Sequence, residues 1–214
     1  MIFRENSTCK PLMEETISKT AEFAFLGVNE RVRRLQTIIQ VRWFSPPEMW
    51  FNLNTDGSSS GNLGRAGGGE LFGILIGWVS GFARVIGYTT SVAAELWALW
   101  DGINLCVDLN LTNVIIELDA KLVVDLLQNE DGRNNGNEVI ITDCREGLKK
   151  IPTMRIQHCF REANMCADAL ARRGAFISQE FVIFQSPPSD VSLLISLDAS
   201  GSVYERKCSV FYVS

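Results

Sequence analysis

Apolar and polar residues alternate in the segment FNLNTD, which ends at Asp56. This period of two predicts a half-buried strand over residues 50–54. The glycine-rich segment that follows, GSSSGNLGRAGGG at residues 57–69, predicts a flexible turn. The pattern therefore places an aspartate at the carboxyl end of a strand, where it can be a turn residue or a ligand for a bound group.

An apolar stripe at helical spacing lies further along the chain. It predicts a helix over residues 92–109, with Ser91 as its N-cap. The stripe consists of Val92, Leu96, Leu99, Ile103 and Cys106. The other predicted elements are strands at 70–77, 78–88, 113–118 and 153–160, and helices at 120–129, 138–149 and 164–174.

The order of these elements, βββαβααβα, predicts an α/β fold with a mixed sheet covered by helices. Three consecutive strands can form an antiparallel meander. The later strands return through helices, so we expect them to run parallel to the first strand.

Two Pro-Pro pairs, at residues 46–47 and 187–188, suggest how the chain is divided. We expect a linker or N-terminal extension at residues 1–47, with a helical segment within about 13–40. A patterned domain is expected at 48–175 and a C-terminal extension at 176–214. In that extension the apolar runs LLISLD and SVYER suggest a hairpin.

Composition excludes several classes of protein. The chain has 214 residues, a net charge of −5, six cysteines without a CxxC pair, and one histidine. A zinc site is therefore not indicated, and no apolar run is long enough to span a membrane. The N-terminus carries acidic residues where a secretory signal needs an apolar stretch. We expect an intracellular protein of the nucleus or cytoplasm, not secreted, and monomeric.

Four carboxylates are predicted to converge at one edge of the sheet. Asp56 and Asp119 each follow a strand, and parallel neighbouring strands end at the same edge, where open α/β sheets bind ligands. Glu95 lies in the first turn of the helix at 92–109, beside its apolar stripe. Asp168 lies in the first turns of the last helix. We expect all four to face the same site.

Clustered carboxylates repel one another unless cations lie between them, and Mg²⁺ prefers such oxygen ligands. Two such ions can activate a water molecule on one side of a phosphodiester and stabilise the leaving oxygen on the other. Each acid alone has an ordinary explanation as a turn residue, a helix cap, a helix-dipole partner or a solvated group. The order and setting of the four together carry the prediction of a two-ion Mg²⁺ site, with Mn²⁺ as a substitute.

Four segments resemble the motif blocks of type 1 ribonuclease H, and more narrowly the plant reverse-transcriptase-like RNase H domains found in or derived from non-LTR retrotransposons. They are NTDGSSSGNLGRAGGG, AAELWALWDGI, IIELDA and REANMCADALA, and the resemblance covers about residues 48–175. It implies an RNase H-like three-layer fold: a five-stranded mixed sheet with helices on both faces. It also implies metal-dependent endonucleolytic cleavage of the RNA strand of RNA–DNA hybrids, with the hybrid as partner.

The resemblance assigns roles residue by residue. The catalytic, metal-binding carboxylates would be Asp56, Glu95, Asp119 and Asp168. The nucleic-acid contacts would be Gly57, Ser58 and Asn62 in the turn, and Asn164 at the start of the last helix.

The chain departs from cellular bacterial enzymes, which carry a mobile loop with glycine and histidine before the last helix. Here TMRIQHCF runs directly into REAN. His158 is expected within the strand, and whether it assists catalysis is left open. Arg161, in the turn, is the better candidate for contacting a phosphate.

Two alternatives to an active ribonuclease follow from the sequence. The acidic net charge and the absence of a long basic insertion favour a catalytically weak or inactive retrotransposon-derived remnant that binds nucleic acid. An Asp-Gly phosphate turn also occurs in ATP-binding sugar-kinase or actin-like folds, but these need two lobes, and 214 residues hold one.

Overall fold

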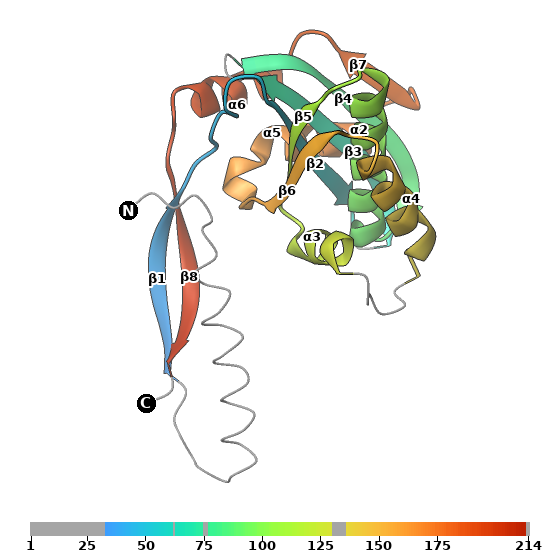
Figure 1. Cartoon of the computed structure of the whole chain (residues 1–214). Helices are drawn as coiled ribbons and strands as arrows, with labels where there is room; N and C mark the ends of the chain where they lie inside the picture. Colours follow the sequence, from blue (N-terminus) through green and yellow to red (C-terminus); the bar gives the residue numbers. More distant parts are fainter. Residues whose placement is uncertain (1–32, 62, 75–76, 130–135, 213–214) are drawn as a thin grey trace. The chain divides into compact units, whose positions relative to one another are not determined.

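The computed structural model describes residues 33–61, 63–74, 77–129 and 136–212 (Figure 1). They fall into two compact units. In the smaller unit, β1 (Arg33–Val41) pairs antiparallel with β8 (Tyr204–Tyr212). The larger unit, Trp43–Ser202, holds every predicted site residue that the structure describes. The predicted functional boundaries at residues 47 and 175 stay predictions.

A mixed sheet forms the centre of the larger unit, with strand order β6-β5-β2-β3-β4-β7. Its strands are β2 (Phe51–Ser59), β3 (Gly64–Ile74), β4 (Gly77–Thr89), β5 (Asn113–Leu118), β6 (Thr153–His158) and β7 (Phe181–Phe184). β2, β3 and β4 are an antiparallel meander, while β5 and β6 run parallel to β2. This confirms the predicted arrangement. The structure adds β7 as a sixth strand, paired antiparallel with β4.

Helices cover both faces of this sheet, as predicted (Figure 1). One face carries α2 (Ser91–Asp108), α3 (Lys121–Gln128) and α4 (Glu138–Leu148), and the other carries α5 (Met165–Gly174) and α6 (Ser189–Ala199). The main core lies between the sheet and α2, where Leu53, Leu96 and Leu99 are fully buried. A smaller core joins α5 and α6 through Leu170 and Val191. None of the described helices is long and apolar enough to cross a membrane.

The predicted glycine-rich turn is wrong over most of its length, because residues 57–59 continue strand β2 and residues 64–69 belong to strand β3. A Cβ atom at Gly67 or Gly69 would overlap the backbone of α5, and one at Gly68 would press against Ala98 of α2. Successive strand residues face opposite sides of a sheet. The glycines therefore let helices approach β3 closely from both sides, a use of glycine that the local sequence does not distinguish from turn formation.

Three further predictions need correction. The helix expected at about 13–40 is wrong over residues 33–40, which lie in β1, and its earlier part lies outside the described residues. β1 is rich in β-branched residues, and its partner strand is far away in sequence. LLISLD belongs to helix α6, so the expected C-terminal hairpin does not form. The N-cap of α2 is Thr90, whose hydroxyl oxygen accepts from the Ala93 amide at 3.2 Å, and not Ser91.

A buried carboxyl group lies in the middle of β3, away from the sheet edge. Glu70 is fully buried and packs against the backbone of Gly102 in α2. Burial raises the pKa of Glu70 well above its ordinary value of 4.5, and the nearby Asp101 raises it further. A contact with the Gly102 backbone offsets part of this effect. Glu70 is therefore a neutral acid in the folded protein over a pH range in which the unfolded chain ionises it.

We expect Glu70→Gln to stabilise the protein at neutral pH. Above pH 4.5 the folded state must hold a proton that the unfolded state has released, which costs about 1.4 kcal/mol per pH unit until the folded pKa is reached. Glutamine stays neutral without a proton. Urea unfolding at pH 5 and pH 8 measures the effect, with the exposed Glu146→Gln as the matched control. An unchanged pH dependence in Glu70→Gln would contradict this assignment.

Candidate metal centre and active site

Three of the four predicted carboxylates meet at the edge of the sheet. Asp56, Glu95 and Asp119 each offer an oxygen atom, and these atoms lie within 4.8 Å of one another. The strand register explains the meeting of the two aspartates. The parallel pairing of β2 with β5 ends at Thr55 and Leu118. The residues that follow, Asp56 and Asp119, therefore lie at the same edge of the sheet. Asp56 is not at the end of its strand, however, because β2 continues to Ser59 in its antiparallel pairing with β3.

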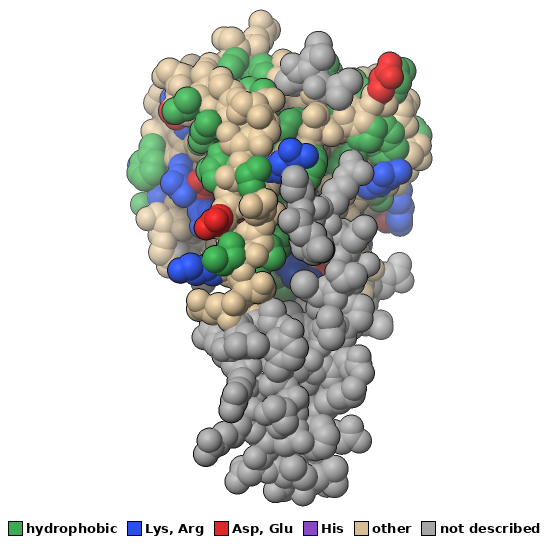
Figure 2. Space-filling view, turned by 90° about the vertical axis from the view of Figure 1, so that its left-hand side faces the viewer, with side chains coloured by type: hydrophobic (Ala, Val, Ile, Leu, Met, Phe, Trp, Pro, Cys, Tyr) green, Lys and Arg blue, Asp and Glu red, His purple; other side chains and the backbone are tan. Residues whose placement is uncertain are grey.

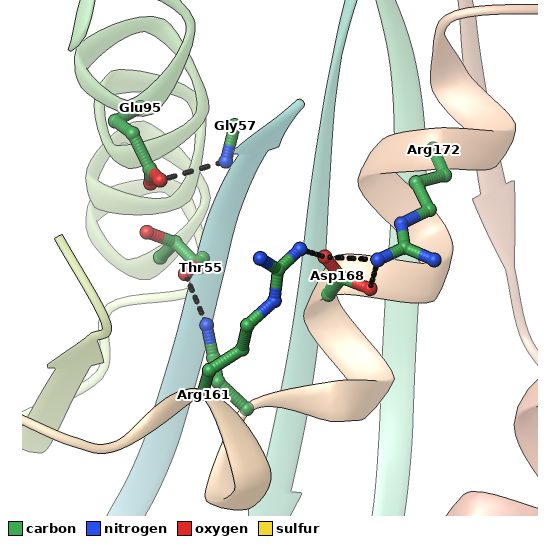
Figure 3. Close-up of polar contacts among 7 residues, drawn as sticks. Thr55, Gly57, Glu95, Arg161, Asp168 and Arg172 are labelled. Atoms are coloured by element: carbon green, nitrogen blue, oxygen red, sulfur yellow. Dashed lines mark hydrogen bonds and ion pairs between the residues drawn. The ribbon is translucent and has the colours of Figure 1, made fainter. Parts of the chain in front are cut away.

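Gly57 brings Glu95 into the cluster. A Cβ atom at Gly57 would overlap the backbone of α2 at Ala94 and Glu95, so only glycine allows the helix to lie this close to β2. The amide of Gly57 donates a hydrogen bond of 3.1 Å to Oε2 of Glu95 (Figure 3). The glycine predicted to contact nucleic acid thus has a packing role that positions one of the carboxylates.

The cluster is electrostatically costly. Asp56 and Glu95 are 5% and 8% exposed, too little for water to screen their charges effectively. Burial raises the pKa of both groups well above their ordinary range, and repulsion from the neighbouring carboxylates raises it further. Burial also raises the pKa of Asp119, whereas the positive charge of Arg161 lowers it. The neighbouring carboxylates Asp119 and Asp168 both oppose the ionisation of Asp56.

The start of α5 is fixed to β2 by Asn164. Its amide nitrogen donates to the backbone oxygen of Thr55 at 3.0 Å, and its amide oxygen accepts from Asn54 at 3.2 Å. Asn164 is only 1% exposed. Because its amide bonds to Thr55 and Asn54, Asn164 has a positioning role within the protein, and its predicted contact with nucleic acid stays a prediction.

A buried polar network lies behind Asp56 on the same side of β2. Oε2 of Glu117 in β5 accepts from the amides of Asn52 at 2.9 Å and Asn54 at 3.1 Å. Gln157 of β6 donates to Oε1 of Glu117 at 2.6 Å. The sequence interpretation missed this network. The available signal was the polar residue Glu117 within the apolar strand NVIIEL.

Asp168 lies beside the cluster and outside the set of three. Its carboxylate is paired with Arg161 at 2.6 Å and with Arg172 at 2.8 Å (Figure 3). Its negative charge still contributes to raising the pKa of Asp56 and Asp119. The structure therefore brings three predicted carboxylates together and holds the fourth next to them on two arginines.

The remaining candidates lie around this centre. Arg161 begins the short helix η1 (Arg161–Ala163), and its side chain is 61% exposed. Ser58 is half-buried in β2, and Asn62 lies outside the described residues. His158 ends β6, as expected, and its Nε2 is 3.1 Å from the backbone oxygen of Asp119. His158 therefore lies against the backbone of Asp119.

The donor set fits a hard divalent cation. The three clustered side chains offer only carboxylate oxygens, the ligand type that Mg²⁺ and Mn²⁺ prefer. Burial and mutual repulsion make the fully ionised cluster unfavourable. A cation bound between the three carboxylates would replace this repulsion by attraction and favour the ionised form. A metal ion is therefore compatible with the residues present.

The chain is similar in sequence to proteins of one known family. The family model described as reverse transcriptase-like matches residues 54–174. A protein of Arabidopsis thaliana, provisionally named a ribonuclease H protein, is 30% identical over 215 positions, which cover 96% of this chain and 34% of that protein. This chain thus spans about a third of the length of that relative.

Solved structures share the fold. RNase H1 from the halophilic archaeon Halobacterium salinarum is 28% identical with a TM-score of 0.56, over 58% of this chain and 96% of that one. LC11-RNase H1, solved in complex with an RNA/DNA hybrid, is 23% identical with a TM-score of 0.54, over 58% of this chain and 96% of that one. The latter likeness supports the fold alone.

We expect Gly57→Ala to destabilise the protein by about 1–3 kcal/mol or more, because the added methyl group must push α2 away from β2. Stabilisation by Mg²⁺ should weaken as well, since Glu95 moves with the helix. Urea unfolding with and without Mg²⁺ measures both effects. Ser58→Ala is the neighbouring control and should change stability by less than about 0.5 kcal/mol. A Gly57→Ala protein with unchanged stability would refute the packing role.

We expect Asp56→Asn to raise the melting temperature in EDTA at pH 8, because it removes a buried carboxyl group whose ionisation is opposed by burial and by two neighbouring carboxylates. The gain should be about 2–4 °C for each kcal/mol of repulsion relieved. The variant should also lose most of the shift that Mg²⁺ produces. A lower melting temperature in EDTA would instead show that Asp56 is a structural residue.

The stabilisation of the wild-type protein by Mg²⁺ should grow from pH 5.5 to pH 8. The raised pKa values mean that the folded protein holds extra protons, so without a cation its stability falls as pH rises above the ordinary carboxylate values. Mg²⁺ binds the deprotonated groups and competes with those protons. Thermal unfolding in EDTA and in Mg²⁺ across this range measures the difference. A Mg²⁺ shift that is independent of pH would argue against binding at these carboxylates.

Proposed function

The chain belongs to the reverse transcriptase-like family, and from this premise we propose that it is a metal-dependent endonuclease that hydrolyses the RNA strand of RNA–DNA hybrids. The observation that carries the proposal is the convergence of Asp56, Glu95 and Asp119, within 4.8 Å, at the edge of an RNase H-type sheet. Support also comes from the name of the Arabidopsis relative and from the 28% identity to an archaeal RNase H1.

Asp56, Glu95 and Asp119 would hold the divalent ion, with Mg²⁺ as the proposed metal. When bound, such ions lower the pKa of a water molecule and stabilise the negative charge that develops on a phosphodiester. The hydrogen bond from the Gly57 amide keeps Oε2 of Glu95 oriented, which limits the reorganisation needed at the site.

Arg161 is the residue that we assign to the scissile phosphate. Its guanidinium group is exposed at the site, and its positive charge lowers the pKa of Asp119, so it lies close to where a phosphate would sit. A planar guanidinium can donate two parallel hydrogen bonds to phosphate oxygens. Gly57 and Ser58 place small groups next to the carboxylates, where they allow a shallow minor groove with its 2′-hydroxyl groups to come close.

A catalytically weak remnant that binds nucleic acid is the second candidate. The observation that favours it is Asp168, whose carboxylate is engaged by two arginines and lies outside the cluster of three. The surface adds to this. On the side drawn in Figure 2, the coloured Lys and Arg side chains are interspersed with hydrophobic and acidic ones.

The two candidates separate in a cleavage assay. We expect an end-labelled RNA strand in an RNA–DNA duplex to be cut at internal positions with Mg²⁺ or Mn²⁺, and to stay intact in EDTA. Asp56→Asn should reduce the rate by at least about a hundredfold, because it removes a cation ligand that no neighbour replaces. The same RNA in an RNA–RNA duplex is the substrate control. Folded protein that binds the hybrid without cutting it would make the remnant the correct reading.

A further inference from the structure

Two arginines occupy the carboxylate of Asp168. Nη2 of Arg161 is 2.6 Å from Oδ1, while Nη2 of Arg172 is 2.8 Å from Oδ2 and 3.1 Å from Oδ1. They reach it from different elements: Arg161 from η1 and Arg172 from one turn further along α5 (Figure 3). Both oxygen atoms of Asp168 are therefore engaged by guanidinium groups.

The exposure of these groups is unequal. The Asp168 side chain is 13% exposed, whereas those of Arg161 and Arg172 are each 61% exposed. The buried partner is held in place by its helix, while the two cations lie at the surface on long, flexible stems. The arginines can therefore change partners with little disturbance of the backbone, and Asp168 cannot move far.

An open groove begins at this clamp. It has a volume of about 850 Å³, runs between α5 and α6, and is lined by both arginines together with Arg173, Phe176 and Leu194. A strand entering the groove from the carboxylate cluster would bring its phosphates to the exposed faces of Arg161 and Arg172. Phosphate oxygens compete well for guanidinium groups because they accept the same paired hydrogen bonds as a carboxylate.

Cation binding at the cluster conflicts with the clamp. Two guanidinium charges on Asp168 repel an incoming divalent ion and leave Asp168 unable to act as a ligand. The charge of Arg161 already reaches Asp56, Glu95 and Asp119, where it favours the ionised forms. Arg161 thus supplies part of the positive charge that a metal ion would supply.

We propose that Arg161 and Arg172 form an exchangeable clamp on Asp168, which nucleic-acid phosphates open. When the arginines transfer to phosphate, Asp168 becomes free to join Asp56, Glu95 and Asp119 around a divalent cation. Cation and nucleic acid then bind cooperatively, and by thermodynamic reciprocity each tightens the binding of the other by the same factor. The proposal rests on the proposed function for the identity of the site, and it makes Arg172 a positioning residue.

The test is the coupling between cation and hybrid. Calorimetric titration with Ca²⁺, an oxygen-seeking divalent probe, gives its dissociation constant for the free protein and for the protein saturated with an RNA–DNA hybrid, with the RNA strand checked for integrity afterwards. For the wild-type protein we expect the hybrid to tighten Ca²⁺ binding about fivefold or more. In Arg172→Gln, and more so in Arg161→Gln/Arg172→Gln, the free protein should bind Ca²⁺ more tightly and the ratio should fall toward one.

Lys149→Gln is the matched control. It removes one positive charge at the exposed end of α4, where Lys149 pairs with Glu146 and does not line the groove. Its coupling ratio should stay at the wild-type value. A wild-type ratio of one, a wild-type ratio retained in the double variant, or an equal loss in Lys149→Gln would each overturn the clamp.

The cleavage assay and the coupling measurement test the proposed function and the clamp independently of each other. Cleavage of the hybrid without coupling would overturn the clamp and leave the ribonuclease standing. Coupling that depends on Arg172, in a protein that does not cut RNA, would support the clamp and overturn the ribonuclease.

Discussion

The repulsion among Asp56, Glu95 and Asp119 is the constraint on which the arrangement of the site depends. Their oxygen atoms are held within 4.8 Å in a largely buried place, where water screens charge poorly. Folding must bring these acids together against their own electrostatics. The strand register and the close contact of Gly57 with α2 bring the three together, while Asn164 anchors the start of α5, the helix that carries Asp168.

The structure contains two different solutions to the burial of a carboxyl group. Glu70 lies beneath α2, with its pKa raised and no basic side chain contributing to it, so the proton stays on. At the sheet edge, Asp168 has two arginines, and the neighbouring cluster is open to a cation. The first solution is stable and inert. At the sheet edge, the negative carboxylates and the positive arginines can each bind an ion of opposite charge from solution. A binding site for a metal ion and a phosphate requires this.

Much of this site could be predicted from the sequence, because its main features are local. Asp56 lies in a strand with a plain alternating pattern and Asp119 follows another strand, and the stripe through Leu96 and Leu99 places Glu95 on the correct helix. The family resemblance joined these acids with Asp168 before any geometry was known, and the family and fold are confirmed. The assignment of the four carboxylates as metal ligands, and of Gly57, Ser58, Asn62, Arg161 and Asn164 as nucleic-acid contacts, remains a prediction.

The main features of the sheet and of α5 that could not be predicted depend on partners distant in sequence. Gly67, Gly68 and Gly69 have turn-forming composition, and only the helices on both sides of β3 show why glycine is needed in a strand. β1 is defined by its pairing with the other end of the chain. Asn164 has the sequence position of a surface cap, but its amide is buried against β2.

The most direct test of this account is to locate the cation. Crystals of the protein grown with Mn²⁺ would reveal the ion by its anomalous scattering. The account predicts a peak bonded to oxygen atoms of Asp56, Glu95 and Asp119, at a distance of about 2.0–2.3 Å. A Mn²⁺ ion bound elsewhere, with these three carboxylates still clustered and free of metal, would contradict it.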